Sequence, residues 1–227
     1  MNVVITGANR GIGLGLVGRY LRAGDSVIAG CRDPDAAHEL KALSASGDLG
    51  IKSLDIGSAH SIHQFAESLS GQPVDVLINN AGVGGGTEQS FMEINEADWL
   101  EVLRINTLAP MFVTRALLDN VRRGKLKKVM MMSSQLGAIS YPSIGYYAYE
   151  TAKAALNKAV RALAQDLEKD GICVCALHPG WVKTDMGGPG APLDVESATT
   201  GLVSTIAKLD LKESGGFWQW NGKPHDW

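Results

Sequence analysis

Short apolar runs alternate with helix-type patterns from one end of the chain to the other, and this alternation restricts the possible fold more than any other feature. The runs that we predict to be β-strands are 2–6, 26–30, 50–54, 74–78, 127–133, 172–178 and 217–219. They are apolar at nearly every position, which is typical of parallel strands covered on both faces. Strands that alternate with helices form βαβ units. We therefore predict one α/β domain over residues 1–227, with a doubly wound, mostly parallel seven-stranded sheet and helices on both faces.

The composition is that of an ordinary globular protein, with 45% hydrophobic and 20% charged residues. The net charge of −3 gives no general attraction to nucleic acid or to an anionic membrane, so we expect neither partner. The chain enters its first strand at once, so we expect no signal peptide, and no apolar run reaches the ~20 residues of a membrane span. We predict a cytoplasmic protein with reduced cysteines and no metal site. Cys173 and Cys175 lie on one predicted strand, where we expect them to face opposite sides.

The segment TGANRGIG, residues 6–13, follows the first predicted strand and opens a predicted helix that runs to about residue 23. Its glycines allow a tight turn and a close approach of the backbone to a pyrophosphate, while the helix N-terminus offers free N–H groups. A loop between a strand and a helix is the context that a dinucleotide-binding motif requires. This pattern predicts a Rossmann-type fold whose first loop contacts the coenzyme through Gly7, Asn9, Arg10, Gly11, Ile12 and Gly13.

The end of the second predicted strand bears on the choice of coenzyme. Arg32 follows this strand at once, and Arg10 lies in the glycine loop nearby. In dinucleotide folds an arginine here accommodates a 2′-phosphate, whereas an acidic residue binds the ribose 2′-hydroxyl. Two guanidinium groups suit a phosphate dianion. We therefore predict NADP(H) over NAD(H), with Asp33 as the counter-argument, because a shift of the strand end by one residue would give it the acidic role.

The ends of the third and fourth predicted strands carry further candidates. Asp55 could accept a hydrogen bond from the adenine amine, or it could cap the helix that starts near Ser58; the sequence supports both readings equally. After the fourth strand, Asn80, Ala81 and Gly82 leave room for the coenzyme ribose.

Tyr149 and Lys153 lie four residues apart in a segment, 143–167, with the apolar periodicity of a long helix. Side chains at this spacing share one helix face, so the phenol and the ammonium point into the same volume. A nearby positive charge favours the phenolate, and we expect the tyrosine pKa to fall toward neutrality, where a general acid or base works best. The alternative for the pair alone is an ordinary helix with a surface tyrosine and lysine.

Three further segments add candidates at the same sheet edge. Pro110 has no N–H, so it leaves the carbonyl of Asn106 without its helical partner, and that carbonyl could hold an ordered water. The fifth predicted strand ends in Ser133 and Ser134, either of which could hydrogen-bond a substrate oxygen or form a turn. After the sixth strand, Thr184 could contact the nicotinamide carboxamide.

These motifs occur in the order found in short-chain dehydrogenases/reductases, and the chain resembles this family along nearly its whole length. The residues that carry the resemblance are TGANRGIG at 6–13, NNAG at 79–82, Asn106, Ser133 with Ser134, Tyr149 with Lys153, and Pro179 with Gly180. Within the family, the segments HPGWVKTDMGGPGAPL and GGFWQWNGKP resemble the C-factor and sniffer-type carbonyl reductase branch.

The resemblance implies a catalytic role for four positions. Tyr149 resembles the catalytic acid/base, and Lys153 resembles the residue that binds the nicotinamide ribose and lowers the tyrosine pKa. Ser134 resembles the substrate-orienting serine, but it lies farther from Tyr149 than in many members, which leaves Ser133 as an alternative. Asn106 resembles the asparagine whose main-chain carbonyl holds a water that leads to the lysine.

Other positions resemble coenzyme contacts. Asp55, followed by Ile56, matches the adenine-binding acid, which favours binding over capping. Arg10 and Arg32 match basic positions of NADP-preferring members. The remaining matching contacts are Asn80, Ala81, Gly82, Pro179, Gly180, Val182 and Thr184.

The resemblance implies an NADPH-dependent oxidoreductase that reduces an aldehyde or ketone to an alcohol, with Tyr149 as general acid/base. The alternative is a cofactor-binding signalling or sensor protein of the C-factor type, in which turnover is incidental. A sugar-nucleotide epimerase is a third reading, but 227 residues leave little room for its extra substrate domain. By resemblance we also expect a homodimer or homotetramer, assembled through the helices that contain Asn106 and Tyr149.

Overall fold

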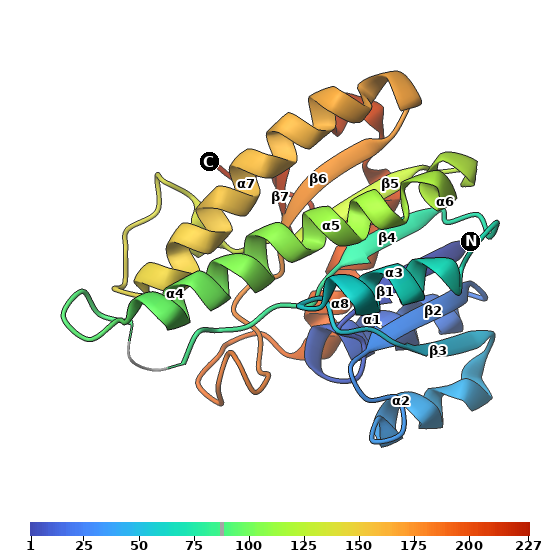
Figure 1. Cartoon of the computed structure of the whole chain (residues 1–227), viewed down its shortest axis with the longest axis horizontal. Coiled ribbons are helices and arrows are strands. Elements are labelled where there is room, and N and C mark those ends of the chain that lie inside the picture. Colours follow the sequence, from blue (N-terminus) through green and yellow to red (C-terminus); the bar gives the residue numbers. More distant parts are fainter. Residues whose placement is uncertain (87–88) are drawn as a thin grey trace.

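The computed structural model describes residues 1–86 and 89–227, and in it the strands form one parallel sheet in the order β3-β2-β1-β4-β5-β6-β7 (Figure 1). This confirms the predicted α/β class and seven-stranded sheet, and every pairing in it is parallel. The strands are β1 Asn2–Thr6, β2 Ser26–Cys31, β3 Leu49–Ser53, β4 Val76–Asn79, β5 Lys128–Met132, β6 Cys173–His178 and β7 Phe217–Gln219. Each lies within two residues of its predicted bounds because a buried parallel strand is an uninterrupted apolar run.

The strands alternate with helices as the sequence predicts. The α-helices are α1 Gly11–Arg22, α2 His38–Ala42, α3 Ala59–Glu67, α4 Glu96–Leu103, α5 Ala109–Ala116, α6 Leu118–Arg123, α7 Tyr147–Leu167 and α8 Val195–Lys208. Short helical segments of other geometry are η1 Leu43–Ser46, η2 Arg104–Leu108, η3 Gln135–Gly137, η4 Glu168–Asp170 and η5 Leu211–Glu213.

The start of α7 differs from the sequence prediction, which placed it at Ser143. The Glu150 carboxylate accepts hydrogen bonds from Ser143 Oγ at 2.6 Å, from Ile144 N at 2.9 Å and from Tyr146 N at 3.4 Å. These bonds hold residues 143–146 outside the helix, so that α7 begins at Tyr147.

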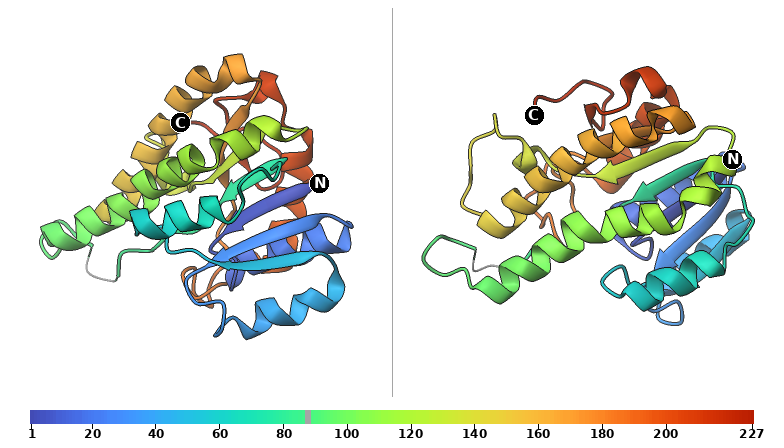
Figure 2. Two further views of the ribbon diagram at one scale, coloured as in Figure 1. Left: turned by 45° about the vertical axis from the view of Figure 1, so that its right-hand side comes forward. Right: turned by 45° about the horizontal axis from the view of Figure 1, so that its top comes forward.

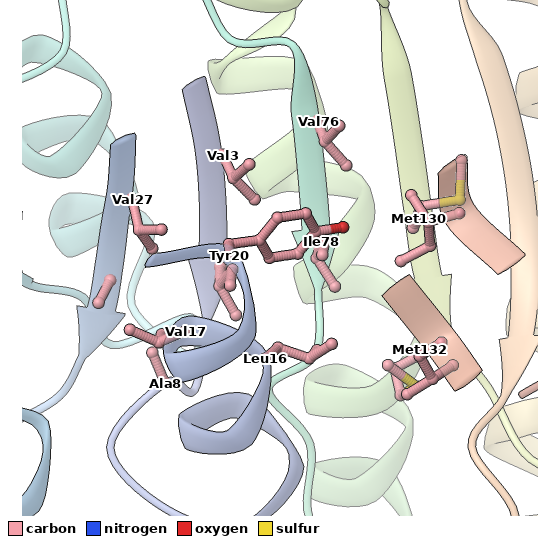
Figure 3. Packing of buried hydrophobic residues seen from close by; sticks show 14 of the residues in the cluster. Val3, Ala8, Leu16, Val17, Tyr20, Val27, Val76, Ile78, Met130 and Met132 are labelled. Atoms are coloured by element: carbon pink, nitrogen blue, oxygen red, sulfur yellow. The ribbon is translucent and has the colours of Figure 1, made fainter. Parts of the chain in front are cut away.

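The sheet has a separate hydrophobic core on each face, because successive residues of a strand point to opposite sides. Val3 and Ile5 pack beneath α1 and α8, while Val4 between them packs beneath α3, α5 and α7. The two further views show these helix layers on opposite sides of the sheet (Figure 2). In the first core the Tyr20 ring of α1 lies across β1 and β4, against residues such as Val3 (Figure 3).

The positions of Cys173 and Cys175 contradict the sequence prediction. Their sulfur atoms lie 3.7 Å apart and both side chains are buried in the same core. The prediction was wrong because residues two apart on a strand share a face. Both are free thiols, as is the buried Cys31. None of the helices in the described ranges has the length and apolar character that crossing a bilayer requires.

The order of the strands places a topological switch point between β1 and β4. The chain continues from β1 to β2 on one side, whereas from β4 it continues to β5 on the other side. In open α/β sheets, ligands bind outside the strand ends at this switch point. The predicted glycine loop and the end of β4 meet here.

Candidate active site

The loop between β1 and α1 is braced by the end of β4. Thr6 Oγ1 accepts hydrogen bonds from the backbone N–H groups of Asn80 and Ala81, each at 3.0 Å. The Asn80 side chain donates in return to Thr6 O at 3.0 Å and to Gly7 O at 3.1 Å. These four bonds fix the loop before any ligand arrives. This role of Thr6 was not predicted, although its place at the start of the glycine motif could have suggested one.

Two glycines of this loop leave no space for a side chain. A Cβ on Gly7 would lie 2.8 Å from Ala81 Cα, and the Gly7 φ angle of +62° also disfavours other residues. A Cβ on Gly13 would lie 2.2 Å from Gly7 O. The backbone therefore approaches its neighbours closely enough to form a smooth cradle.

The first turn of α1 follows the cradle directly, and the first N–H groups of a helix have no partner within it. No side chain in the described ranges caps this turn, and it contains no acidic residue. Asn9 and Arg10 are exposed and Ile12 is half-buried, while Gly11, at φ +52°, would place a Cβ 3.2 Å from the Thr184 methyl group. An uncapped helix start beside a glycine cradle suits an anionic pyrophosphate.

The charged residues near the end of β2 make different contacts. Arg32 is exposed. Arg10 Nη1 forms an exposed ion pair with Asp185 Oδ2 at 2.8 Å. Asp33 Oδ1 accepts from the backbone N–H groups of Asp35 at 2.9 Å and Ala36 at 3.1 Å, so this carboxylate stabilises a turn.

The structure separates the two readings of Asp55. Ser58 is the N-cap of α3, and its hydroxyl accepts from Ser61 N at 3.3 Å. Asp55 accepts instead from Gly57 N at 2.9 Å and stays exposed. Capping of α3 is therefore not its role, and its carboxylate is accessible beside the half-buried Ile56.

The end of β4, the η2 segment and α7 meet around Asn106. Its side-chain amide donates to Val83 O at 2.8 Å and its oxygen accepts from Val83 N at 2.9 Å. A Cβ on Gly82 would lie 2.9 Å from Asn106 Oδ1 and 3.7 Å from Lys153 Nζ. Gly82 is thus the close-approach position that lets Asn106 and Lys153 come together.

The helix irregularity predicted from Pro110 is a π-helical segment, η2, at Arg104–Leu108. Its hydrogen bonds span five residues instead of four, and such π-bulges are frequent at functional sites. Thr107, which follows Asn106, donates from Oγ1 to Ala152 O at 2.8 Å and so joins η2 to α7 just before Lys153.

The two serines at the end of β5 have distinct environments. Ser133 Oγ donates to Asn157 Oδ1 at 2.6 Å inside the protein. Ser134 Oγ accepts from Leu136 N at 3.2 Å, and the Ser134 hydroxyl also lowers the pKa of Tyr149 by hydrogen bonding to the phenol. Of the two, Ser134 therefore belongs with the tyrosine.

Lys153 is buried and Tyr149 beside it is half-buried, and desolvation shifts the pKa of both groups. The Lys153 Nζ atom donates to Met132 O at 2.8 Å and lies 5.6 Å from the centre of the Tyr149 ring. Burial raises the pKa of Tyr149 to about 12, against the smaller lowering effect of Ser134. Burial lowers the pKa of Lys153 to about 8. The predicted fall of the phenol pKa toward neutrality was wrong for this geometry, because desolvation of the phenolate outweighs the ammonium.

The segment after β6 supports the cradle from the other side. Pro179 and Val182 are buried, and Val182 forms a β-bridge with Leu193. Gly180, at φ +87°, would place a Cβ 2.8 Å from Leu193 Cδ2. Thr184 Oγ1 accepts from Gly187 N at 3.1 Å, so the threonine that contacts Gly11 is held by its own turn.

Comparison with known proteins agrees with this geometry. A family model described as short chain dehydrogenase matches residues 1–191. The chain belongs to the short-chain dehydrogenase family. C-signal of Myxococcus xanthus is a relative with 41% identity over 164 residues, which cover 72% of this chain and 98% of the relative.

Solved structures of carbonyl reductases are similar to this short-chain dehydrogenase over its full length. The carbonyl reductase Sniffer of D. melanogaster shares 34% identity at a TM-score of 0.93, with coverage of 100% of this chain and 99% of the other. The NADPH-bound carbonyl reductase from chicken fatty liver shares 34% identity at a TM-score of 0.92, with coverage of 100% and 98%. The predicted family, sniffer/C-factor type and oxidoreductase class are confirmed.

The site of this short-chain dehydrogenase contains one residue for which the sequence offers no signal. Gln89 is buried, with 2% of its surface exposed, and its side chain accepts from Tyr149 N at 3.1 Å. It follows three glycines in a segment without a recognisable motif. Only the folding of this segment against α7 brings Gln89 to the tyrosine.

Proposed function

We propose that the protein reduces an aldehyde or ketone to an alcohol with NADPH. The observation that carries this proposal is the half-buried Tyr149 phenol, which interacts with Ser134 and whose ring centre lies 5.6 Å from Lys153 Nζ, at the sheet edge that also bears the glycine cradle. With a pKa of about 12 the phenol is protonated at neutral pH, so it is a proton donor. Donation to a carbonyl oxygen is the chemistry that this state suits.

Each catalytic side chain has a separate task in this proposal. A bound nicotinamide supplies the hydride to the carbonyl carbon. The Ser134 hydroxyl orients the carbonyl oxygen and stabilises the negative charge that develops on it. Tyr149 donates its proton to that oxygen. Lys153, whose pKa of about 8 leaves it mainly protonated at pH 7, stabilises the resulting phenolate from one helical turn away.

Asn106 has a supporting task in the same proposal. Its side chain is fully used in two bonds to Val83. It therefore secures the strand end beside Lys153, and its main-chain carbonyl in the π-helical segment is the group that we assign to the ordered water.

The residues around the cradle fit NADP(H). A Cβ at Gly7 or Gly13 would collide with the backbone, so the loop is shaped for close approach of a pyrophosphate. Asp33 is bound into a turn, which favours the exposed Arg32 as the group that meets a 2′-phosphate. Arg10 can join it, since an exposed ion pair such as that with Asp185 contributes only about 0–1 kcal/mol.

The other predicted coenzyme contacts remain proposals of the same kind. We assign Asp55 and Ile56 to the adenine. The ribose and nicotinamide would meet Asn80, Ala81, Gly82, Tyr149, Lys153, Pro179, Gly180, Val182 and Thr184.

A signalling function is the second candidate, and the relative named C-signal favours it. A signalling protein needs the coenzyme cradle but not the tyrosine. The two candidates therefore differ in what Tyr149→Phe does to biological activity: a reductase loses it, whereas a signalling protein with incidental turnover keeps it.

We further infer that residues 1–227 form one domain in the cytoplasm, and that two copies associate through α4, α5 and α7. The apolar side chains of Leu100, Leu108 and Phe112 on the α4–α5 side are 56%, 50% and 43% exposed. Apolar patches of this kind mark association surfaces. Sedimentation of the purified protein distinguishes a dimer or a tetramer from a monomer.

NADPH oxidation against a panel of aldehydes, ketones and diketones tests the main proposal. We expect turnover by the wild type and a loss of about 1,000-fold in kcat/KM for Tyr149→Phe, with a much smaller change in NADPH affinity because the other coenzyme contacts remain. Tyr146→Phe, at the exposed residue just before α7, is the matched control and should retain activity. Tight NADPH binding without turnover of any carbonyl would contradict the proposal.

A further inference from the structure

The side chain of Gln89 joins the loop after β4 to the first turn of α7. Its Nε2 group donates to Gly84 O at 2.7 Å and to Gly86 O at 3.0 Å. Its Oε1 atom accepts from Tyr149 N at 3.1 Å, and its backbone carbonyl accepts from Tyr147 N at 3.3 Å. One buried residue thus makes four bonds across this junction.

The hydrogen bonds from α7 to Gln89 satisfy backbone N–H groups that have no partner within the helix. The first N–H groups of a helix have no partner within it, and the N-cap residue Tyr146 offers no side-chain bond. Tyr147 and Tyr149 are the first and third residues of α7, and Gln89 serves the N–H group of both. The carboxylate of Glu150 binds only the preceding residues 143–146. Gln89 is therefore the contact that reaches the backbone of the tyrosine itself.

The bonds to the loop fix the other side of the site. Gly85, at φ +87°, packs on the Gln89 amide, because a Cβ there would lie 3.3 Å from Gln89 Cδ. The neighbouring Gly84 would place a Cβ 3.5 Å from Met186 Cγ, and Val83 is bound to Asn106. The segment 83–86, to which Gln89 is hydrogen-bonded, thus lies between Asn106 and the loop after β6.

We propose that Gln89 is a positioning residue for carbonyl reduction. It holds the Tyr149 backbone in register with Ser134 and Lys153, and it fixes the segment 83–86 as a wall of the substrate site. This position requires a primary amide, because its oxygen accepts a hydrogen bond from Tyr149 N while its NH₂ group donates to Gly84 O and Gly86 O. This inference rests on the proposed function of Tyr149 as proton donor.

Two substitutions separate the two halves of the role. Gln89→Met keeps the length of the side chain but removes both the acceptor for Tyr149 N and the donor to Gly84 O and Gly86 O. Gln89→Glu keeps an acceptor for Tyr149 N but turns an oxygen toward the carbonyls of Gly84 and Gly86. Gln165→Met, at an exposed position near the far end of α7, is the control for the same chemical change on the same helix.

The expected results are kinetic and structural. For Gln89→Met we expect kcat to fall about tenfold and the carbonyl KM to rise, because a hydrogen bond of this kind contributes up to about tenfold in an equilibrium. NADPH affinity should stay within about twofold, because the cradle is not touched. For Gln89→Glu we expect the carbonyl KM to rise about tenfold with a smaller change in kcat, because only the loop contacts are lost. Gln165→Met should match the wild type.

Amide hydrogen exchange reads the hydrogen bond without any turnover. The Tyr149 N–H should exchange about tenfold faster in Gln89→Met than in the wild type, while that of Leu156, deeper in α7, keeps its rate. In Gln89→Glu the Tyr149 N–H should stay protected.

Failure of this inference and failure of the proposed function give different results. A wild type that binds NADPH but reduces no carbonyl contradicts the proposed function. A wild type that turns over, together with a folded Gln89→Met of unchanged kcat and carbonyl KM, overturns the inference. If Gln89→Met does not fold, Gln89→Glu decides, and unchanged carbonyl KM in that variant also overturns it.

Discussion

Two sets of glycines in the site, one in the coenzyme loop and one on the substrate side, have different surroundings. At Gly7 and Gly13 an added Cβ would lie within 3 Å of the backbone of neighbouring segments. At Gly86, Gly145 and Gly188 on the substrate side, φ is positive but nothing lies within 4 Å of the Cβ position. The first group permits close packing, and the second only permits turns. Glycine content alone therefore does not identify a binding cradle.

The two sides also differ in how their side chains are held. Around the cradle, Thr6 and Asn80 are bound to the backbone. On the substrate side large apolar side chains are open, with Ile139 85%, Trp181 56% and Met186 56% exposed. We infer a preorganised coenzyme site beside a substrate site that is apolar and adaptable, with Gln89 as its main internal support.

The largest effect should come from Gly13→Ala, which tests how rigid the cradle is. A Cβ at 2.2 Å from Gly7 O forces the backbone apart. We expect NADPH affinity to fall about 1,000-fold, or about 4 kcal/mol. Gly190→Ala, which has nothing within 4 Å, is the control and should bind normally in a fluorescence titration. Normal NADPH binding by Gly13→Ala would contradict the view that the coenzyme loop is more tightly packed than the substrate side.

The next largest effect is on the pH dependence of stability and comes from His178, at the end of β6 beside the substrate side. Burial, assisted by the nearby His225, lowers the pKa of His178 to about 4, and its Nδ1 atom accepts from Gln135 N at 3.2 Å. In the unfolded chain His178 takes up a proton near pH 6.5, whereas in the folded protein it does so only near pH 4. The contribution of neutral His178 to the free energy of unfolding is therefore fully present above pH 6.5 and is lost as the pH falls toward 4.

The contribution of His178 should reach about 3 kcal/mol over this window. His178→Asn keeps an acceptor for Gln135 N without the titration, so the rise in unfolding free energy from pH 4 to 6.5 should flatten. Urea melts across this range measure it. An equally steep rise in the variant would show that another group controls the acid stability.

A smaller effect, on the preference for NADPH over NADH, is expected from the exposed arginines of the coenzyme side. Arg10→Ser with Arg32→Ser should reduce the preference for NADPH over NADH about 30-fold, or about 2 kcal/mol. The kcat/KM values for both coenzymes measure it. Asp33→Asn is the control; if it changed the preference more than the arginine pair, Asp33 would have the ribose role.

The smallest effect should come from Met186→Ala on the substrate side. Met186 is 56% exposed and lies beside Gly84, so we expect the fold to stay intact when its side chain is removed. We expect carbonyl KM values to change about threefold, or less than about 1 kcal/mol, with unchanged NADPH affinity. A clear loss of NADPH affinity would mean that the two sides are coupled rather than separate.

The fold was predictable because each element depends on local patterns. Apolar runs placed the strands, and the spacing of Tyr149 and Lys153 indicated their shared helix face. The glycine segment indicated the cradle. The start of α7 was missed because the Glu150 carboxylate holds back residues that helical periodicity alone would include.

The errors came where two distant segments or the solvent decide the outcome. The Tyr149 pKa depends mainly on burial, which raises it more than the hydrogen bond with Ser134 lowers it. The capping alternative for Asp55 depended on which side chain reaches the helix, and Ser58 is the one that does. The shared face of Cys173 and Cys175, in contrast, follows from the two-residue period of a strand and was predictable from the sequence.

The sequence by itself determined the alternating architecture, the glycine cradle and the residues able to transfer a proton, because periodicity and motif spacing act within single segments. Only the tertiary structure decided which serine faces Tyr149, that Asp33 is bound in a turn and that Gln89 supports the catalytic helix. These outcomes depend on hydrogen bonds and burial between segments far apart in the chain, and such contacts arise only when the whole sheet assembles.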